Sequence, residues 1–224
     1  TYGVSSGTAP VNTRVRIEGN SIQMNGSSTL YGIYIYYMNS LSNDPSTIIN
    51  NMVYCSPTSS STNYGIYSYH LANTNIYHNS IDIEAGSTSA RCAYFSGTTS
   101  ISSFVPGNVE VRNNIFTNYG AGQLIYVTGV ADDGGYFGNI NSNLYYANGA
   151  NWFYYGANVA VLTAWQTATG YDAASITGDP IFIGGGDLHV LGGAPNDAGD
   201  NGVGVFSDID GDTRPYPGST IVDI

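Results

Sequence analysis

One spacing recurs five times along the chain: an aliphatic residue, an asparagine three positions later, and a bulky apolar residue two positions after that. The five instances are Ile17–Asn20–Ile22, Ile48–Asn51–Val53, Ile76–Asn79–Ile81, Val111–Asn114–Phe116 and Ile140–Asn143–Tyr145. Successive asparagines lie 31, 28, 35 and 29 residues apart. A repeat of this length is typical of solenoids, in which each unit stacks on its neighbours to bury a shared core. The chain is therefore predicted to form stacked coils.

A second column of residues follows each asparagine by 11 to 16 positions. It pairs an apolar residue with a tyrosine, and the tyrosines are Tyr34, Tyr67, Tyr94, Tyr126 and Tyr154. Two strand positions in constant order within each repeat indicate at least two parallel sheets along one axis. Side chains alternate between the two faces of a strand, so if the apolar residues point inward the tyrosines point outward. With strands about 4.8 Å apart, five stacked tyrosines would form a strip about 19 Å long.

The chain carries few charges, and most of them are negative. Of its 224 residues 9% are charged, none is lysine, and the net charge is −11. Nucleic acids and anionic membrane surfaces are therefore not predicted as partners. No apolar run approaches the length of about 18 residues that a membrane helix needs, so membrane insertion is not predicted. The chain begins with Thr1 and without a signal peptide, and we expect it to be a mature or excised piece of a longer protein.

Two cysteines permit at most one internal disulfide. Cys55 follows Asn51 by four residues, whereas Cys92 follows Asn79 by thirteen. These unequal offsets place the two cysteines on different faces of the coil, where the Cα spacing of a disulfide is hard to reach. Two buried free thiols are the prediction, and a disulfide is the alternative.

The repeated columns resemble the right-handed parallel β-helix of the pectate-lyase-like superfamily over residues 12 to 157. The resemblance implies an all-β fold of about five coils and a structural role for the asparagines, whose amides hydrogen-bond along such stacks. The predicted organisation is residues 1–157 as coils and residues 158–224 as a C-terminal cap continuous with them. A solenoid leaves its last coil open, so a different terminal unit is needed to cover it. Residues 159–168 have helical apolar spacing and include Trp165, which we interpret as a packing residue.

The segment that follows resembles the closing part of large secreted, surface-attached proteins of Bacteroidota. The motifs that carry this second resemblance are Leu162–Gln166, Thr169–Asp172, Asp179–Phe182, Asp187–Val190 and Asp208–Pro215. It implies an extracellular or cell-surface location in a bacterium, and further domains of the same parent chain as neighbours.

Enzymes of the superfamily need particular groups that this sequence offers only in part. The resemblance implies that lyases use Arg or Lys with Ca²⁺ and a base, and glycoside hydrolases use paired carboxylates. Arg16 and Arg112 lie three coils apart and so do not belong to one site. Asp132 and Asp133 are adjacent acids, but they stand before Gly134 in a sequence typical of a turn.

The candidate metal ligands are Asp208, Asp210 and Asp212. Alternating acids can surround a hard cation with oxygen atoms, so Ca²⁺ is the candidate cofactor. The alternative is that these aspartates accept hydrogen bonds from the backbone of a turn. Gly211 comes too early for an EF-hand loop, which separates the segment from that motif.

The tyrosine column is the candidate carbohydrate-binding site. Aromatic rings on a rigid scaffold can follow a linear glycan, and the alternative is that they stabilise the sheet by stacking on one another. We predict a non-catalytic stalk or adhesin-like module that binds a polysaccharide or cell-surface glycan along Tyr34 to Tyr154. The rival prediction is a polysaccharide lyase or glycoside hydrolase with Asp132, Asp133 and the arginines as participants.

Overall fold

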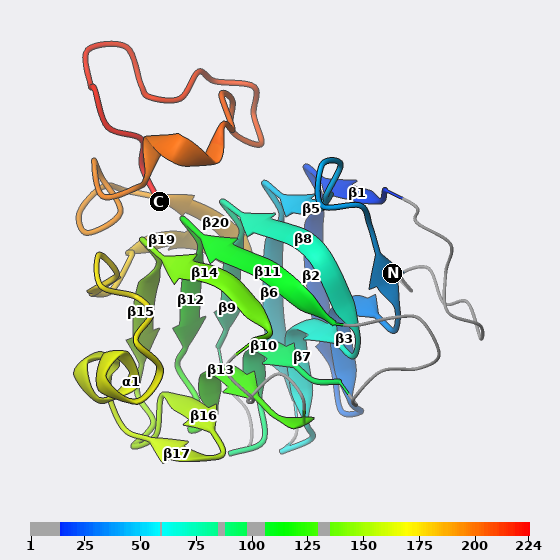
Figure 1. Ribbon diagram of the computed structural model, residues 1–224. Coiled ribbons are helices and arrows are strands. Elements are labelled where there is room, and N and C mark those ends of the chain that lie inside the picture. The colour runs from blue at the N-terminus through cyan, green and yellow to red at the C-terminus, as the bar shows by residue number, and fades with distance from the viewer. Residues whose placement is uncertain (1–13, 59, 85–87, 98–105, 130–134) are drawn as a thin grey trace.

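The computed structural model describes residues 14–58, 60–84, 88–97, 106–129 and 135–224. Three parallel sheets run along one axis and form a β-solenoid (Figure 1). Sheet 1 contains β1 (Arg16–Glu18), β5 (Ser46–Ile49), β8 (Leu71–Tyr77), β11 (Gly107–Arg112) and β14 (Phe137–Asn141), with β4 (Met38–Asn39) also paired to β8. Sheet 2 contains β2 (Ser21–Gly26), β6 (Met52–Pro57), β9 (Ser80–Ile83), β12 (Ile115–Asn118), β15 (Leu144–Ala147) and β18 (Ile176–Thr177). Sheet 3 contains β3 (Leu30–Ile35), β7 (Asn63–Ser68), β10 (Arg91–Phe95), β13 (Gln123–Val127), β16 (Phe153–Tyr155) and the antiparallel β17 (Ala157–Val159).

Each coil contributes one strand to each sheet in the order sheet 1, sheet 2, sheet 3, and there are about five coils. The prediction of an all-β parallel β-helix is therefore confirmed. Alternation along the strands sends the apolar residues inward, where they form one continuous core along the axis. In sheet 3, for example, Ile33, Ile66 and Ile125 are buried while the tyrosine that follows each of them is only partly buried.

The five asparagines of the repeat occupy the turn between sheet 1 and sheet 2. The Nδ2 group of each of Asn20, Asn51, Asn79 and Asn114 donates to Oδ1 of the asparagine in the next coil, over 2.8 to 3.0 Å. The same Oδ1 atom also accepts from the backbone N–H of the earlier asparagine. The asparagine column therefore pairs the backbone N–H group at four of the five turns, and Ser175 Oγ accepts from the fifth, that of Asn143.

The residue before each asparagine adopts a left-handed conformation. These residues are Gly19, Asn50, His78, Asn113 and Ser142, with φ between 51° and 65°. The turn from sheet 1 to sheet 2 requires this conformation, which glycine and asparagine adopt at low cost and other residues adopt less readily.

The asparagine column ends at the buried carboxylate of Asp172, which accepts from Asn143 Nδ2. The helix α1 (Leu162–Thr169) lies beside this end and closes the last coil (Figure 1). Trp165 of α1 is fully buried, and its ring stacks on Phe153 at 4.9 Å between centroids. The helix ends at Gly170, which has φ of 77°. The predicted short helix and the packing role of Trp165 are confirmed.

Residues 179–224 do not continue this end cap but lie along the outside of sheet 2. A hairpin is formed by β19 (Phe182–Gly184) and β20 (Asp187–Val190), of which β20 packs on β6 and β9, and a 3₁₀ helix, η2 (Asn201–Val203), follows. A second core forms there, in which Ile115 and Leu144 of sheet 2 meet Ile224. Because these outward positions of sheet 2 are apolar, they need a cover that the polar turns of the coils do not supply.

Polar contacts join the C-terminal segment to coils far apart along the axis. Asn113 of the fourth coil contacts Asp200 through both its Nδ2 and Oδ1 atoms. In the second coil, Asn50 Nδ2 donates to the Ser207 carbonyl oxygen, and in the first coil Gln23 Nε2 donates to the Gly186 carbonyl oxygen. In chain order, the segment therefore meets the first coil at Gly186, the fourth at Asp200 and the second at Ser207.

Both cysteines are buried free thiols, as predicted. Cys55 lies on β6 of sheet 2 and Cys92 on β10 of sheet 3, and burial raises the pKa of the Cys55 thiol to about 12. Among the residues that the structure describes, no helix has the length and apolar character that crossing a membrane requires.

Candidate functional site

The five predicted tyrosines form one continuous stack on the outward face of sheet 3. Successive ring centroids from Tyr34 through Tyr67, Tyr94 and Tyr126 to Tyr154 are 5.0, 4.8, 5.4 and 4.2 Å apart. The angles between neighbouring ring planes are between 1° and 14°. Backbone pairing holds the tyrosines directly opposite one another from coil to coil. We call this feature the tyrosine strip.

The rings of the tyrosine strip turn their faces toward one another. Parallel rings about 5 Å apart along the solenoid axis leave their edges and hydroxyl groups, rather than their faces, on the outside of the sheet. Each of the five residues is partly buried, in agreement with this arrangement. A sugar ring therefore meets a row of phenol hydroxyls and ring edges, and hydrogen bonding becomes the main mode of contact that the strip offers.

A second, shorter column stands beside the tyrosine strip. Tyr31 and Tyr64 stack at 5.1 Å, and both make edge-to-face contacts with the strip. Arg91 continues this column in the next coil, and its guanidinium lies over the Tyr126 ring at 4.4 Å from the centroid. Sequence reasoning missed this column because it is aromatic only in the first two coils. The arginine brings one positive charge to a face whose described strands contain no carboxylate.

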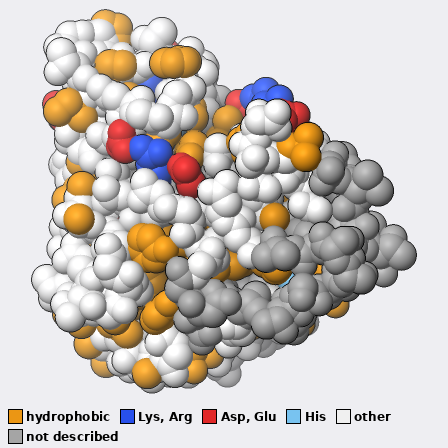
Figure 2. All heavy atoms as spheres, in the orientation of Figure 1, with side chains coloured by type: hydrophobic (Ala, Val, Ile, Leu, Met, Phe, Trp, Pro, Cys, Tyr) orange, Lys and Arg blue, Asp and Glu red, His pale blue; other side chains and the backbone are white. Residues whose placement is uncertain are grey.

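The residues suggested for an enzymatic site do not meet in the part of the chain that the structure describes. Asp132 and Asp133 lie outside the described residues. Arg16 pairs with Glu18, whereas Arg112 lies between Glu110 and Asp200. Figure 2 shows the charged side chains of this face in small groups in which blue lies against red, separated by uncharged surface. Both arginines are thus used in ion pairs with acids of their own surroundings.

The candidate metal ligands lie in a turn of the C-terminal segment. Asp208 Oδ1 accepts from the backbone N–H groups of Asp210 and Asp212 over 3.0 and 2.8 Å. Asp210 Oδ2 instead lies 2.6 Å from His189 Nε2. In the described part of the chain, no three His, Cys, Asp or Glu side chains are arranged so that they could hold a metal ion. Calcium binding by this segment stays a prediction, and the hydrogen bonds favour the turn-forming alternative for Asp208.

His189 is held between two carboxylates that sequence reasoning did not connect. Its Nδ1 atom contacts Asp187 of the same strand, and its Nε2 atom contacts Asp210 from the turn 21 residues later. The hydrogen bond to Asp187, together with that to Asp210, raises the pKa of His189 above its usual value. Alternation on β20 could have predicted that Asp187 and His189 share a face, but only the fold brings Asp210 to them.

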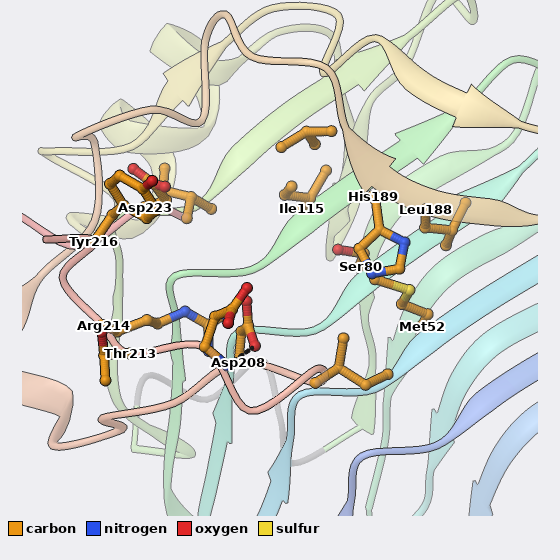
Figure 3. Close-up of a pocket in the computed structure, with 14 residues that line it drawn as sticks. Met52, Ser80, Ile115, Leu188, His189, Asp208, Thr213, Arg214, Tyr216 and Asp223 are labelled. Atoms are coloured by element: carbon orange, nitrogen blue, oxygen red, sulfur yellow. Dashed lines mark hydrogen bonds between the residues drawn. The ribbon is translucent and has the colours of Figure 1, made fainter.

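A cavity of about 170 Å³ lies beside His189, between sheet 2 and the C-terminal segment. Met52, Ile115 and Leu188 form its apolar side, and Arg214 and Asp208 lie on the opposite side (Figure 3). Arg214 Nη1 donates to Asn50 Oδ1 over 2.7 Å and to the Ser207 carbonyl oxygen over 3.0 Å. The charged side chains here therefore anchor the C-terminal segment to the coils.

A buried acid on the outward face of sheet 2 gives the fold a pH dependence. Burial raises the pKa of Asp82 to about 6, although the Thr117 hydroxyl donates to it over 2.6 Å. An unfolded aspartate has a pKa of about 3.9. The folded protein therefore favours the protonated form of Asp82 more than the unfolded chain does. The contribution of this form to the free energy of unfolding is fully present below about pH 4, near the unfolded pKa, and is lost as the pH rises through the folded pKa of about 6.

Asp82→Asn is expected to raise the free energy of unfolding at pH 7 by about 1–3 kcal/mol, because a neutral amide avoids the cost of burying the charge. The difference in the free energy of unfolding between the variant and the parent should shrink toward zero at pH 4. Urea unfolding at pH 4, 5, 6 and 7 measures it. Asp44→Asn, at an exposed residue, serves as the control. A variant that is less stable than the parent at pH 7 would show that the ionised form of Asp82 is the one that the fold needs.

Comparison with known proteins finds no relative of this chain. No protein-family model matches the chain, and no curated protein or solved structure matches it significantly.

Proposed function

We propose that this chain is a non-catalytic module of an extracellular or cell-surface protein, stalk-like or adhesin-like, that binds a polysaccharide along the tyrosine strip. Under this proposal the chain is a β-helix of the pectate-lyase-like type that has kept the scaffold without a catalytic site, and further domains of the parent chain adjoin it. The observation that carries the proposal is the regular row of five tyrosines at spacings of 4.2 to 5.4 Å on one rigid sheet.

The strip suits a linear, hydroxylated polymer for two reasons. Phenol hydroxyls both donate and accept hydrogen bonds, as sugar hydroxyls do, so the two rows can pair without a charged group. The stack is also ordered before binding, because the three inner rings each lie between two others and each strand is paired on both sides through most of sheet 3. A pre-ordered surface loses little conformational entropy when a ligand binds.

The double substitution Tyr67→Ala and Tyr94→Ala is expected to weaken polysaccharide binding about tenfold or more. It interrupts the strip at its centre and leaves Tyr34, Tyr126 and Tyr154 without a continuous row. Retardation in affinity electrophoresis through gels that contain neutral or acidic polysaccharides measures the effect. Tyr216→Ala, at a 70% exposed tyrosine of the C-terminal segment, is the control and should leave the mobility unchanged. Equal retardation of the double variant and the parent would remove the strip from the proposal.

A polysaccharide-active enzyme is the second candidate, and one observation favours it. His189, flanked by Asp187 and Asp210, lies next to the cavity that contains Arg214, so titratable groups do gather at one place on the surface. Both ring nitrogens of His189 are occupied by these carboxylates, which makes the imidazole a structural bridge rather than an accessible base. For this reason the binding function is preferred.

A further inference from the structure

A polar groove lies where the β19–β20 hairpin crosses the outward face of the first two coils of sheet 2. It consists of two open hollows of about 590 and 420 Å³, and Gln23 lines both of them. Volumes of about 300–1,000 Å³ are typical of sites for small ligands. We call the two hollows together the sheet-2 groove. It lies on a different sheet from the tyrosine strip, so either site can exist without the other.

The groove is lined mainly by hydroxyl and amide groups. On the coil side these belong to Ser21, Gln23, Asn25, Tyr54 and Ser56, and on the hairpin side the wall includes Gly185 and Gly186. Alcohols and amides that alternate along a strand match the donors and acceptors of a sugar. Such a lining is poorly suited to an apolar ligand, because its polar groups would lose their water without replacement.

Tyr54 gives the groove an aromatic ring that, unlike the rings of the tyrosine strip, has no aromatic neighbour in its own column. Its neighbours in the adjacent coils are Gln23 and Asp82, neither of which is aromatic. No ring of its own column therefore stacks on Tyr54 from above or below. Within the groove this ring is the feature that can pack against the apolar side of a sugar, while the amides beside it bind hydroxyls.

The hairpin wall is fixed in place. Gln23 Nε2 donates to the Gly186 carbonyl oxygen over 3.2 Å, a contact between residues 163 positions apart. Gly186 has φ of 91°, and a Cβ atom added to it would lie 2.7 Å from the Gln23 amide. The close approach of the hairpin to the first coil thus depends on glycine, and it forms the groove without a ligand.

The charge of the groove selects against acidic ligands. Besides the neutral Tyr54, the titratable side chains that line it are Asp187, His189 and Asp210, two carboxylates against one imidazole, and the described lining contains no arginine. Carboxylates accept hydrogen bonds from sugar hydroxyls, but they repel uronates and sulfates. The net charge of −11 for the whole chain acts in the same direction.

We propose that the sheet-2 groove binds a short neutral oligosaccharide, with Tyr54 packing against a sugar ring and Gln23 and Asn25 binding its hydroxyls. The proposal adds a second glycan site to the chain and names its ligand class. It does not require the tyrosine strip to bind anything.

The test is isothermal titration calorimetry of the full chain with neutral xylo-, cello- and manno-hexaoses and with an oligogalacturonate of the same length. At least one neutral hexaose should bind, and the oligogalacturonate should bind about tenfold more weakly or not at all. Gln23→Ala and Tyr54→Ala should each weaken binding of the neutral ligand about tenfold. Gln23 is exposed but also bonds to the Gly186 carbonyl oxygen, so circular dichroism and urea unfolding check that Gln23→Ala keeps the fold, and Tyr54→Ala tests the groove without removing that bond. Tyr146→Ala, at the tyrosine of the same outward column three coils away, should bind as the parent does.

The outcomes separate this proposal from the proposed function. If the Tyr67→Ala and Tyr94→Ala double variant keeps hexaose binding while Gln23→Ala loses it, the groove is the site. If the double variant loses hexaose binding and Gln23→Ala keeps it, the groove proposal is overturned and the tyrosine strip stands. Absence of binding by all three neutral hexaoses, or equal binding of the oligogalacturonate, also overturns the groove proposal.

Discussion

Asn79→Ala is expected to lower the free energy of unfolding by about 3–5 kcal/mol, because it breaks the asparagine column at its centre. The Asn79 amide oxygen accepts from the backbone N–H and Nδ2 of Asn51. Its Nδ2 donates to the carbonyl oxygens of Ile48 and Tyr77 and to Asn114 Oδ1. All these groups are shielded from water, so alanine leaves several polar atoms without partners, and a buried unsatisfied group costs about 1–3 kcal/mol.

Urea unfolding followed by circular dichroism measures this effect. The matched control is Asn20→Ala, at the first and exposed member of the same column, where water can replace the lost bonds. Its cost should stay near 1 kcal/mol, the typical net value of one exchanged hydrogen bond. If the two substitutions cost the same, the column does not stabilise the coil cooperatively, and the core alone would hold the coils together.

Asp172→Ala is expected to cost about 3–4 kcal/mol, because it removes the acceptor at the end of the asparagine column. The carboxylate accepts from Asn143 Nδ2, Tyr145 OH, Trp165 Nε1 and Ser175 Oγ. Its own exposure is 1%, so water does not reach the donors that alanine would leave behind. These donors come from the last coil, from α1 and from Ser175 just before β18, and one carboxylate therefore joins all three.

The loss should appear in two readouts. The denaturant midpoint should fall, and the tryptophan fluorescence of the folded state should change because Trp165 loses its partner at 2.6 Å. Asp44→Ala, at an exposed aspartate paired with Arg14, is the control and should stay within about 0.5 kcal/mol of the parent. An Asp172→Ala variant with the parent's midpoint would mean that α1 is held by apolar packing alone.

The stacked coils could be predicted from sequence because every coil repeats the same requirements. An inward aliphatic residue, a turn asparagine and an outward tyrosine recur in order, and this order also predicts the register. The orientation of the tyrosine rings could not be predicted from the spacing alone, because rings about 5 Å apart lie face to face along the strip but edge to face between Tyr64 and Tyr67. The left-handed conformation of the residue before each asparagine could not be predicted, because no one residue type marks it. The five positions hold four residue types: Gly19, Asn50, His78, Asn113 and Ser142.

The path of the C-terminal segment could not be predicted in the same way. It has no repeat, and its contacts join residues very far apart, as Gln23 and Gly186 or Asn50 and Arg214 do. Such contacts depend on which outward face of the solenoid is apolar. The repeat indicated at least two sheets, and the apolar outward face could be identified only after the structure showed three. The sheet-2 groove and the contact of His189 with Asp210 both arise from this packing, so neither could be predicted from sequence.

We propose above all that this β-helix binds a polysaccharide without cleaving it. The most direct test is to incubate the full chain with the polysaccharide that retards it most in affinity electrophoresis, and then to measure the chain-length distribution of that polysaccharide by size-exclusion chromatography. We expect clear retardation of the protein and an unchanged length distribution after prolonged incubation with or without Ca²⁺. Progressive shortening of the polysaccharide, lost in a His189→Ala variant, would contradict it and identify an enzyme.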